Sequence, residues 1–179
     1  MQLSQLTDER TLVRRAQTDA QAFGALYDRY VQRVYRYCLY RTHNVHEAED
    51  LTAQIFLAAL EGLPRYRQDG HFAAWLFAIA NRKVADYHRR KPLEPLDEAL
   101  LPPLHADLEL TVEKSQRSAR LLRLIQALAE EERDLIHLRY VAELSFAEIA
   151  VTLKKSEEAV KKMLYRLIAR LKAALEADS

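Results

Sequence analysis

Hydrophobic residues recur at three- to five-residue intervals along most of the chain, a spacing that predicts helices rather than strands. The clearest helix runs from His71 to Lys91 and ends before Pro92, which cannot donate a backbone hydrogen bond. One side of this helix is polar and largely basic, so the helix is suited to lying along a polyanion. Its apolar side contains Phe72, Trp75, Leu76, Ile79, Val84 and Tyr87.

Similar patterns predict three more helices in the first half of the chain, within residues 1–22, 22–41 and 46–63. Thr7 or Asp8 is a candidate N-cap for the first of them. In the third, the side chains expected to face inward are Leu51, Ile55, Leu57 or Ala58, and Leu60.

The C-terminal part predicts helices over residues 112–128 and 130–141, followed by two capped helices. Ser145 and Glu148 have the spacing of a capping box, and Ser156 can cap the last helix. Two capped helices joined by a turn of about three residues are typical of a helix-turn-helix. An ordinary helical hairpin with a solvated basic face is the alternative. In the first interpretation the last helix presents to a DNA major groove the side chains of Lys161, Lys162, Tyr165 and Arg166.

Composition supports an all-α fold with two small helical domains. The 179 residues include only three glycines, whereas good helix formers are abundant. Residues 92–112 hold four of the five prolines and five acidic side chains, with no Lys or Arg. We therefore interpret them as an extended acidic linker between domains at 1–91 and 113–179. A spacer with no role beyond its length is the alternative.

Other features limit the functions open to the chain. There is no apolar run of 18 residues and no basic-then-apolar leader, so we expect a cytoplasmic protein without membrane insertion. The single cysteine, Cys38, excludes an internal disulfide and suits a reducing compartment. No glycine-rich phosphate loop, nucleophile elbow or paired-carboxylate site is visible, so we expect neither catalytic residues nor a cofactor.

A metalloprotein or an enzyme is a further class to weigh. Metal sites need converging ligands with supporting partners. A buried cysteine and partly exposed histidines are the more ordinary interpretation, and we expect no metal site. A candidate cluster for a metal contains Cys38, His43, His46, Glu47 and Asp50.

Three segments together resemble the bacterial sigma factors of RNA polymerase, specifically the small extracytoplasmic-function (ECF) type. They are AEDLTAQIF (48–56), FAAWLFAIANRKVADYHRR (72–90) and YVAELSFAEIAVTLKKSEEAVKKMLYRL (140–167), in the family's order and spacing. The resemblance implies that the first block is sigma domain 2, which binds core polymerase and recognises and melts the promoter −10 element. It implies that the last block is sigma domain 4, which recognises the −35 element.

The resemblance also implies roles for individual residues. The residues implied to bind core polymerase are Asp50, Leu51, Gln54, Ile55 and Phe56. Trp75 is assigned to the core. The residues assigned to recognition and melting of the −10 element are Arg65, Tyr66, Arg67, His71, Phe72, Asn81, Arg82, Lys83, Arg89 and Arg90. The residues implied to recognise the −35 element are Ser156, Lys161, Lys162, Tyr165 and Arg166. The implied partners are core RNA polymerase, promoter DNA and an anti-sigma factor that sequesters both domains.

The chain departs from the family pattern at several positions. Ala53-Gln54 replaces a usual Gln-Glu, and Asn81-Arg82 reverses the usual Arg-Asn. Lys154, Glu158 and Met163 stand where Gly, Gly and Arg are common, so we expect an unusual −35 preference. A helix-turn-helix regulator that never engages polymerase remains the alternative, because it explains residues 113–179 equally well; it leaves AEDLTAQIF unexplained.

Overall fold

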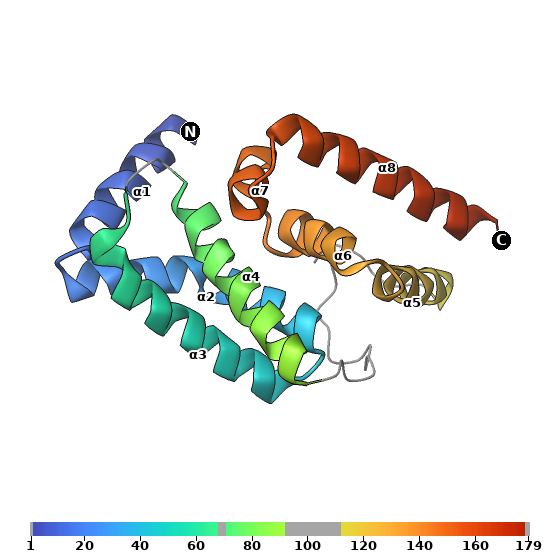
Figure 1. Ribbon diagram of the computed structural model, residues 1–179, viewed down its shortest axis with the longest axis horizontal. Helices are drawn as coiled ribbons and strands as arrows, with labels where there is room; N and C mark the ends of the chain where they lie inside the picture. The colour runs from blue at the N-terminus through green and yellow to red at the C-terminus, as the bar shows by residue number, and fades with distance from the viewer. Residues whose placement is uncertain (1, 68–70, 92–111, 178–179) are drawn as a thin grey trace.

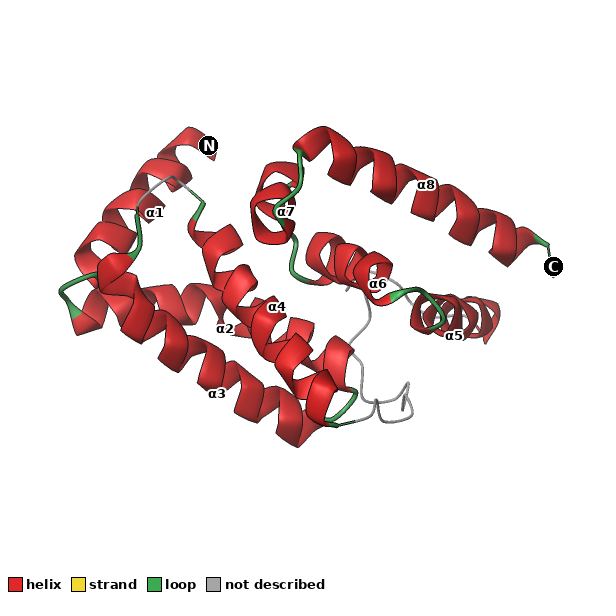
Figure 2. Ribbon diagram, in the orientation of Figure 1, coloured by secondary structure: helices red, strands yellow, loops and turns green. Residues whose placement is uncertain are grey.

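Every regular element of the protein is helical within the residues described by the computed structural model, which are 2–67, 71–91 and 112–177 (Figure 2). This confirms the all-α prediction. None of the helices in these ranges combines the length and the apolar character needed to cross a membrane. The elements are α1 (Gln2–Ala16), α2 (Ala20–Thr42), α3 (Val45–Gly62), a 3-10 turn η1 (Leu63–Arg65), α4 (Phe72–Arg90), α5 (Val112–Gln126), α6 (Glu130–Ile136), a π-helical turn η3 (His137–Val141), α7 (Phe146–Leu153) and α8 (Glu157–Glu176).

The helices form two groups, α1 to α4 and α5 to α8, as Figure 1 shows. This agrees with the prediction of two helical domains, whose boundaries at 91 and 113 stay predictions. The acidic linker predicted between them lies outside the described residues, apart from Val112 at the start of α5.

In the first group α2, α3 and α4 pack against one another and α1 packs against α2, because each helix has an apolar side. Two side chains cap the entrances of these helices: Asp19 accepts a hydrogen bond from the Gln21 amide (2.9 Å) and Asn44 accepts one from the Glu47 amide (3.1 Å). The side chains fully enclosed between the helices include Leu26, Val34, Tyr37, Ile55, Leu76 and Phe77.

Two details of this group differ from the sequence predictions. The prediction of an N-cap at Thr7 or Asp8 is wrong, because α1 runs through both residues. The prediction that Leu60 faces inward is also wrong. Ala59, four residues after Ile55, takes the inward position, so Leu60 is 45% exposed.

The second group follows its predicted capping closely. Ser145 and Glu148 form the predicted capping box, and the Ser156 hydroxyl accepts from the Ala159 amide (3.2 Å). The inward side of α8 consists of Val160, Leu164, Leu167 and Leu171, which recur at three- or four-residue intervals. The helix predicted over 130–141 begins as α6 and finishes as η3.

The two groups also pack against each other, α2 against η3 and α4 against α7. The Thr152 hydroxyl of α7 is shared between the Glu148 carbonyl of its own helix (2.8 Å) and the Ala74 carbonyl of α4 (3.2 Å). The Arg33 guanidinium of α2 donates twice to the Ala142 carbonyl just after η3, at 2.9 and 2.6 Å. One continuous buried core therefore spans both groups.

Candidate nucleic-acid interface

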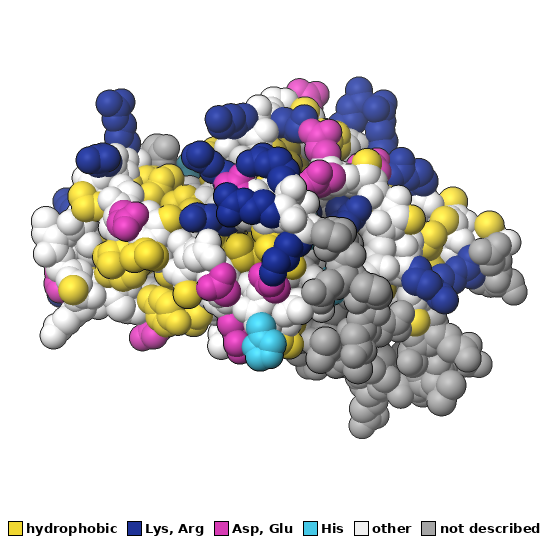
Figure 3. All heavy atoms as spheres, turned by 60° about the horizontal axis from the view of Figure 1, so that its bottom comes forward, with side chains coloured by type: hydrophobic (Ala, Val, Ile, Leu, Met, Phe, Trp, Pro, Cys, Tyr) yellow, Lys and Arg dark blue, Asp and Glu magenta, His cyan; other side chains and the backbone are white. Residues whose placement is uncertain are grey.

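A hollow of about 510 Å³ opens between the end of α3, the η1 turn and the exposed side of α4. It combines aromatic rings, aliphatic groups and cations, which is the mixture that holds an unpaired nucleobase beside its phosphates. Figure 3 shows Lys and Arg side chains gathered across the face that carries α3 and α4, with hydrophobic side chains beside them. The lining residues are Ala58, Gly62, Arg65, Tyr66, Trp75, Ile79, Arg82, Lys83 and Asp86.

The aromatic wall of the hollow differs in two respects from the sequence prediction. The rings of Tyr66, Phe72 and Trp75 pack against one another in tilted or edge-on arrangements, with centroids 4.8 to 6.0 Å apart. Phe72 is only 4% exposed and packs on Tyr30, so its ring serves the core. Trp75, which we assigned to the core, is half-buried and lines the hollow together with Tyr66.

Two residues that sequence reasoning missed hold this wall in place. The Gln17 amide nitrogen donates to the Leu63 carbonyl (3.1 Å) and to the Tyr66 carbonyl (2.9 Å), which fixes the η1 turn from α1. Gly62 lies against Trp75, since a Cβ atom at position 62 would come within 3.2 Å of the Trp75 ring. Neither residue carries a signal in the sequence, because both act through contacts far along the chain.

Of the predicted −10 cations, Arg65, Arg82 and Lys83 line the hollow, and the others lie outside it. Arg65, Arg67, Arg82 and Arg90 are exposed, and Lys83 lies between this hollow and a second one of about 240 Å³ bordered by α3 and α4. Arg89 is exposed but forms an ion pair with Asp86. His71 is half-buried at the start of α4.

Asn81 does not present its whole amide to solvent. Its Oδ1 accepts a hydrogen bond from the Tyr37 hydroxyl (3.0 Å), and Tyr37 is fully buried. Burial raises the pKa of Tyr37 to about 12, so the hydroxyl remains a donor at any ordinary pH. Arg82, the next residue, projects outward instead. The reversal of Asn and Arg therefore places an amide inside and a cation outside.

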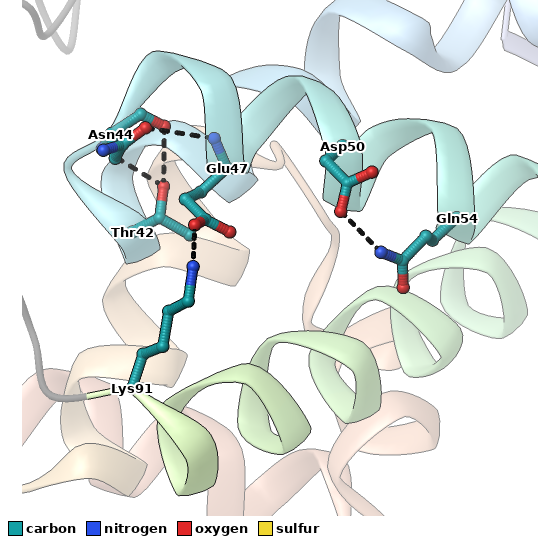
Figure 4. Close-up of polar contacts among 6 residues, drawn as sticks. All are labelled: Thr42, Asn44, Glu47, Asp50, Gln54 and Lys91. Atoms are coloured by element: carbon teal, nitrogen blue, oxygen red, sulfur yellow. Dashed lines mark hydrogen bonds and ion pairs between the residues drawn. The ribbon is translucent and has the colours of Figure 1, made fainter.

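The predicted polymerase-binding residues of α3 divide between the core and the surface. Leu51, Ile55 and Phe56 are at most 6% exposed and pack inside the domain. Asp50 and Gln54 are exposed, and the Gln54 amide donates to the Asp50 carboxylate at 2.6 Å (Figure 4).

The same side of α3 carries apolar side chains that the predicted set left out. Leu57 is 58% exposed and Leu60 45% exposed, and nearby Tyr27 of α2 is 40% exposed and packs edge-on against Phe56. Residues three and four apart share one side of a helix. Asp50, Gln54, Leu57 and Leu60, together with Tyr27, therefore form one accessible polar–apolar stripe, which we call the α3 face.

Near the start of α3 the chain is tied to the end of α4. Glu47 forms an ion pair with Lys91, and Asn44 both caps α3 and contacts Thr42 (Figure 4). These contacts hold the first turn of α3 beside the last basic residues of α4. The α3 face and the basic side of α4 are thereby fixed relative to each other.

The last helix presents a second basic surface. Tyr165 is 62% exposed, and Lys162 and Arg166, four residues apart, are exposed on the same side of α8. Lys161 is partly exposed but is held toward α7, because it pairs with Glu157 (2.6 Å) and lies 5.6 Å from the Phe146 ring centroid. Ser156 caps the helix. We call Lys162, Tyr165 and Arg166 the α8 stripe.

The residues of the alternative metal site do not converge. Cys38 is enclosed in the core, where burial raises the pKa of its thiol to about 12, whereas the His46 side chain is 94% exposed. Across the described ranges no three His, Cys, Asp or Glu side chains are grouped as metal ligands.

Comparison with known proteins identifies both halves of the chain. The family described as Sigma-70 region 2 matches residues 26–92, and the family described as Sigma-70, region 4 matches residues 118–171. The ECF RNA polymerase sigma factor ShbA of Streptomyces griseus is 33% identical over 187 residues, covering 94% of this chain and 98% of its own length. The chain belongs to the ECF sigma factors.

Further similarities agree with that assignment. The ECF sigma factor BldN of Streptomyces coelicolor is 37% identical over 174 residues, which are 94% of this sigma factor and 66% of BldN. The structure of CnrH in complex with the cytosolic domain of CnrY matches with a TM-score of 0.73 at 26% identity, over 95% of this chain and 98% of CnrH. The sigma factor directs RNA polymerase to promoters, and the alternative of a regulator that never engages polymerase is not favoured.

Proposed function

We propose that this sigma factor docks on core RNA polymerase through the α3 face. The face combines a carboxylate and an amide at Asp50 and Gln54 with the exposed leucines 57 and 60. A few accessible apolar anchors surrounded by polar groups carry most of the energy of a protein interface. Leu51, Ile55 and Phe56 support this face from inside rather than touching polymerase.

The hollow beside α4 is proposed to hold a base extruded from the melted −10 element. Tyr66 and Trp75 offer ring surfaces, and Arg65, Arg82 and Lys83 surround them with positive charge. This combination is the observation that carries the proposal. A stacked base is worth about 1–3 kcal/mol, which offsets part of the cost of unpairing it.

The α8 stripe is proposed to read the −35 element, with Lys162 and Arg166 on phosphates or base edges and Tyr165 between them. Lys161 and Ser156 are assigned supporting roles, because one is paired with Glu157 and the other caps the helix. Because acidic residues occupy the first turn of α8, we still expect an unusual −35 preference.

The remaining parts of the proposal concern partners and setting. The protein has no chemistry of its own and leaves catalysis to the polymerase. It acts in the cytoplasm, where polymerase and chromosomal DNA are found, and an anti-sigma protein that contacts both domains regulates it. The similarity to CnrH, whose structure contains the cytosolic domain of CnrY, supports such a partner.

The proposed role of the hollow beside α4 is tested by measuring open-complex formation on a promoter that carries a fluorescent base analogue in the −10 element. Replacing Tyr66 with Ala is expected to lower the open fraction by about 10- to 100-fold, in line with the loss of one stacked base. Tyr66→Phe, the matched control, keeps the ring and is expected to retain the signal. Equal loss in both variants, or in neither, would contradict a stacking role for Tyr66.

The α3 face is tested separately by the affinity of the purified sigma factor for core polymerase. Leu57→Arg places a charge at the proposed contact and is expected to weaken binding at least tenfold. Tyr165→Arg is the matched control, because that side chain is equally exposed but lies on α8. The docking proposal fails if both variants bind core as the parent protein does.

A further inference from the structure

The first helix of the protein carries two cations that none of the proposed contacts uses. Arg10 and Arg14 of α1 are exposed and four residues apart, which places them on one side of the helix, about 6 Å apart along its axis. Within the described part of the chain neither forms an ion pair, whereas Arg15, on a different side of α1, pairs with Asp19. We call Arg10 and Arg14 the α1 row. Two neighbouring cations without an acidic partner are available to a ligand from outside the chain.

The side of α1 that carries the row is also the side that reaches the hollow beside α4. Gln17, directly after α1, follows Arg14 by three residues and Arg10 by seven, a spacing that puts all three along one side. Its amide nitrogen donates to the carbonyls of Leu63 and Tyr66, which joins α1 to the η1 turn at the end of α3 (Figure 1). The α1 row therefore starts beside the turn that holds the Tyr66 ring.

The start of α4 is attached to the same helix farther back. The Phe72 ring packs on the Tyr30 ring, with centroids 5.4 Å apart, and the Tyr30 hydroxyl donates to the Glu9 carboxylate of α1. Glu9 also pairs with Arg29, so this carboxylate is engaged by α2. The α1 row thus lies between two points, Glu9 and Gln17, where α1 is linked to the borders of the aromatic wall.

The α1 row extends the positive surroundings of the hollow beyond α4. The hollow itself is lined by Arg65, Arg82 and Lys83, and Arg65 belongs to the η1 turn that Gln17 holds. A base in the hollow brings with it the phosphates on either side of its nucleotide. Cations that follow such a strand neutralise those phosphates and make its affinity depend on salt. A strand that leaves the hollow across η1 meets the α1 row next.

We propose that the α1 row binds the sugar–phosphate backbone of the single DNA strand whose base enters the hollow. The path of the strand rests on the proposed base-holding role of the hollow, to which the row adds a contact outside it. Charge complementarity identifies the partner, because the row is continuous with a cationic hollow lined by aromatic rings. A protein partner fits less well, since the described side chains of α1 include no exposed large apolar group to anchor one.

The test measures by fluorescence anisotropy the affinity of the holoenzyme for a single-stranded oligonucleotide at several salt concentrations. The oligonucleotide carries the −10 strand of a promoter that the parent holoenzyme transcribes, selected from a randomised library. Arg10→Gln combined with Arg14→Gln is expected to reduce the slope of log affinity against log salt by about 1.4, because each phosphate contact on a single strand contributes about 0.7.

Two controls separate charge from structure. Arg10→Lys combined with Arg14→Lys keeps both charges and is expected to retain the parent slope. Arg15→Gln removes a cation from a different side of the same helix and is expected to leave the slope unchanged. A slope that falls as far in the lysine variant as in the glutamine variant overturns a role for charge at the α1 row.

Neutral methylphosphonate linkages, placed one at a time along the oligonucleotide, locate the contact. One or two adjacent linkages are expected to weaken binding by the parent holoenzyme several-fold and to leave binding by the glutamine double variant unaffected. The reason is that the affected phosphates have already lost their partners in that variant, so the two changes are not additive. If every linkage weakens both proteins equally, the α1 row does not touch the strand.

The outcomes distinguish the α1 row from the hollow. An unchanged salt slope in the glutamine double variant overturns the row, even where Tyr66→Ala still weakens binding. Parent-like affinity of Tyr66→Ala, together with a reduced slope in the double variant, overturns the base-holding role and supports the row. Weaker binding of the double variant to core polymerase without DNA would identify an acidic protein surface as the partner and overturn the assignment to DNA.

Discussion

Lys154 ends α7 in a left-handed backbone conformation, with φ 55° and ψ 44°, and this makes its replacement by glycine informative. A residue with a Cβ atom pays about 1–2 kcal/mol in this region, whereas glycine does not. Glycine in turn gives the unfolded chain more freedom, which costs about 0.5–1 kcal/mol. Lys154→Gly is therefore expected to stabilise the second domain by about 0.5–1 kcal/mol.

The assay is urea or thermal unfolding followed by circular dichroism. A gain of this size raises the midpoint by about 1–4 °C for a chain of this length. Lys154→Ala is the control, because it removes the same charge but keeps the Cβ atom, and it is expected to bring no gain. The Lys155 amide, which donates to the Ala150 carbonyl at 2.9 Å, keeps the turn closed in all three proteins.

Two results would refute this reasoning. Equal stability of the glycine and alanine variants would show that the strain at residue 154 only balances the freedom that glycine adds to the unfolded chain. A glycine variant less stable than the alanine variant would show that the freedom of the unfolded chain outweighs the strain.

Three further predictions concern DNA binding, capping and pH. Lys162→Ala is expected to reduce the slope of log affinity for DNA against log salt by about 0.9, measured by fluorescence anisotropy at several salt concentrations, while Lys172→Ala leaves the slope unchanged. Ser145→Ala removes the cap of α7 and is expected to cost about 1 kcal/mol in urea unfolding. Burial, and then Arg41, lower the pKa of His88 from 6.5 to about 4, so the unfolded chain binds more protons between these pH values and stability falls as the pH is lowered through that range. His88→Gln is expected to flatten this fall, and an unchanged pH profile would contradict it.

The helices and their caps could be predicted because they depend on nearby residues. Apolar spacing located each of the long helices, and Ser145 with Glu148 gave the start of α7. The same local logic explains Lys154, since a position where the family commonly has glycine proves to be left-handed. These features need no knowledge of the rest of the chain.

The surfaces were harder to predict. Apolar residues lie on more than one side of α3, and periodicity alone does not say that Ile55 and Phe56 pack inside while Leu57 is left for a partner. The orientation of Asn81 depends on the hydroxyl of Tyr37, which is 44 residues away. Distant packing decides both cases.

The contact between the domains carried no sequence signal at all. Arg41 and Asp134 belong to residue types that are usually solvated, and nothing near either residue indicates a partner 93 positions away. Charge patterning correctly suggested a basic side for α4. It could not show which of the other charged side chains become enclosed when α2 meets α6.

Gly62 gives the hollow beside α4 an adjustable size. Because a methyl group at this position would press within 3.2 Å of the Trp75 ring, Gly62→Ala pushes the indole toward the hollow by a few tenths of an ångström. Under the proposed base-holding role, the residue at position 62 would therefore set how large a base fits in the hollow. On that proposal, a substitution at position 62 changes promoter choice while every side chain proposed to meet DNA stays the same.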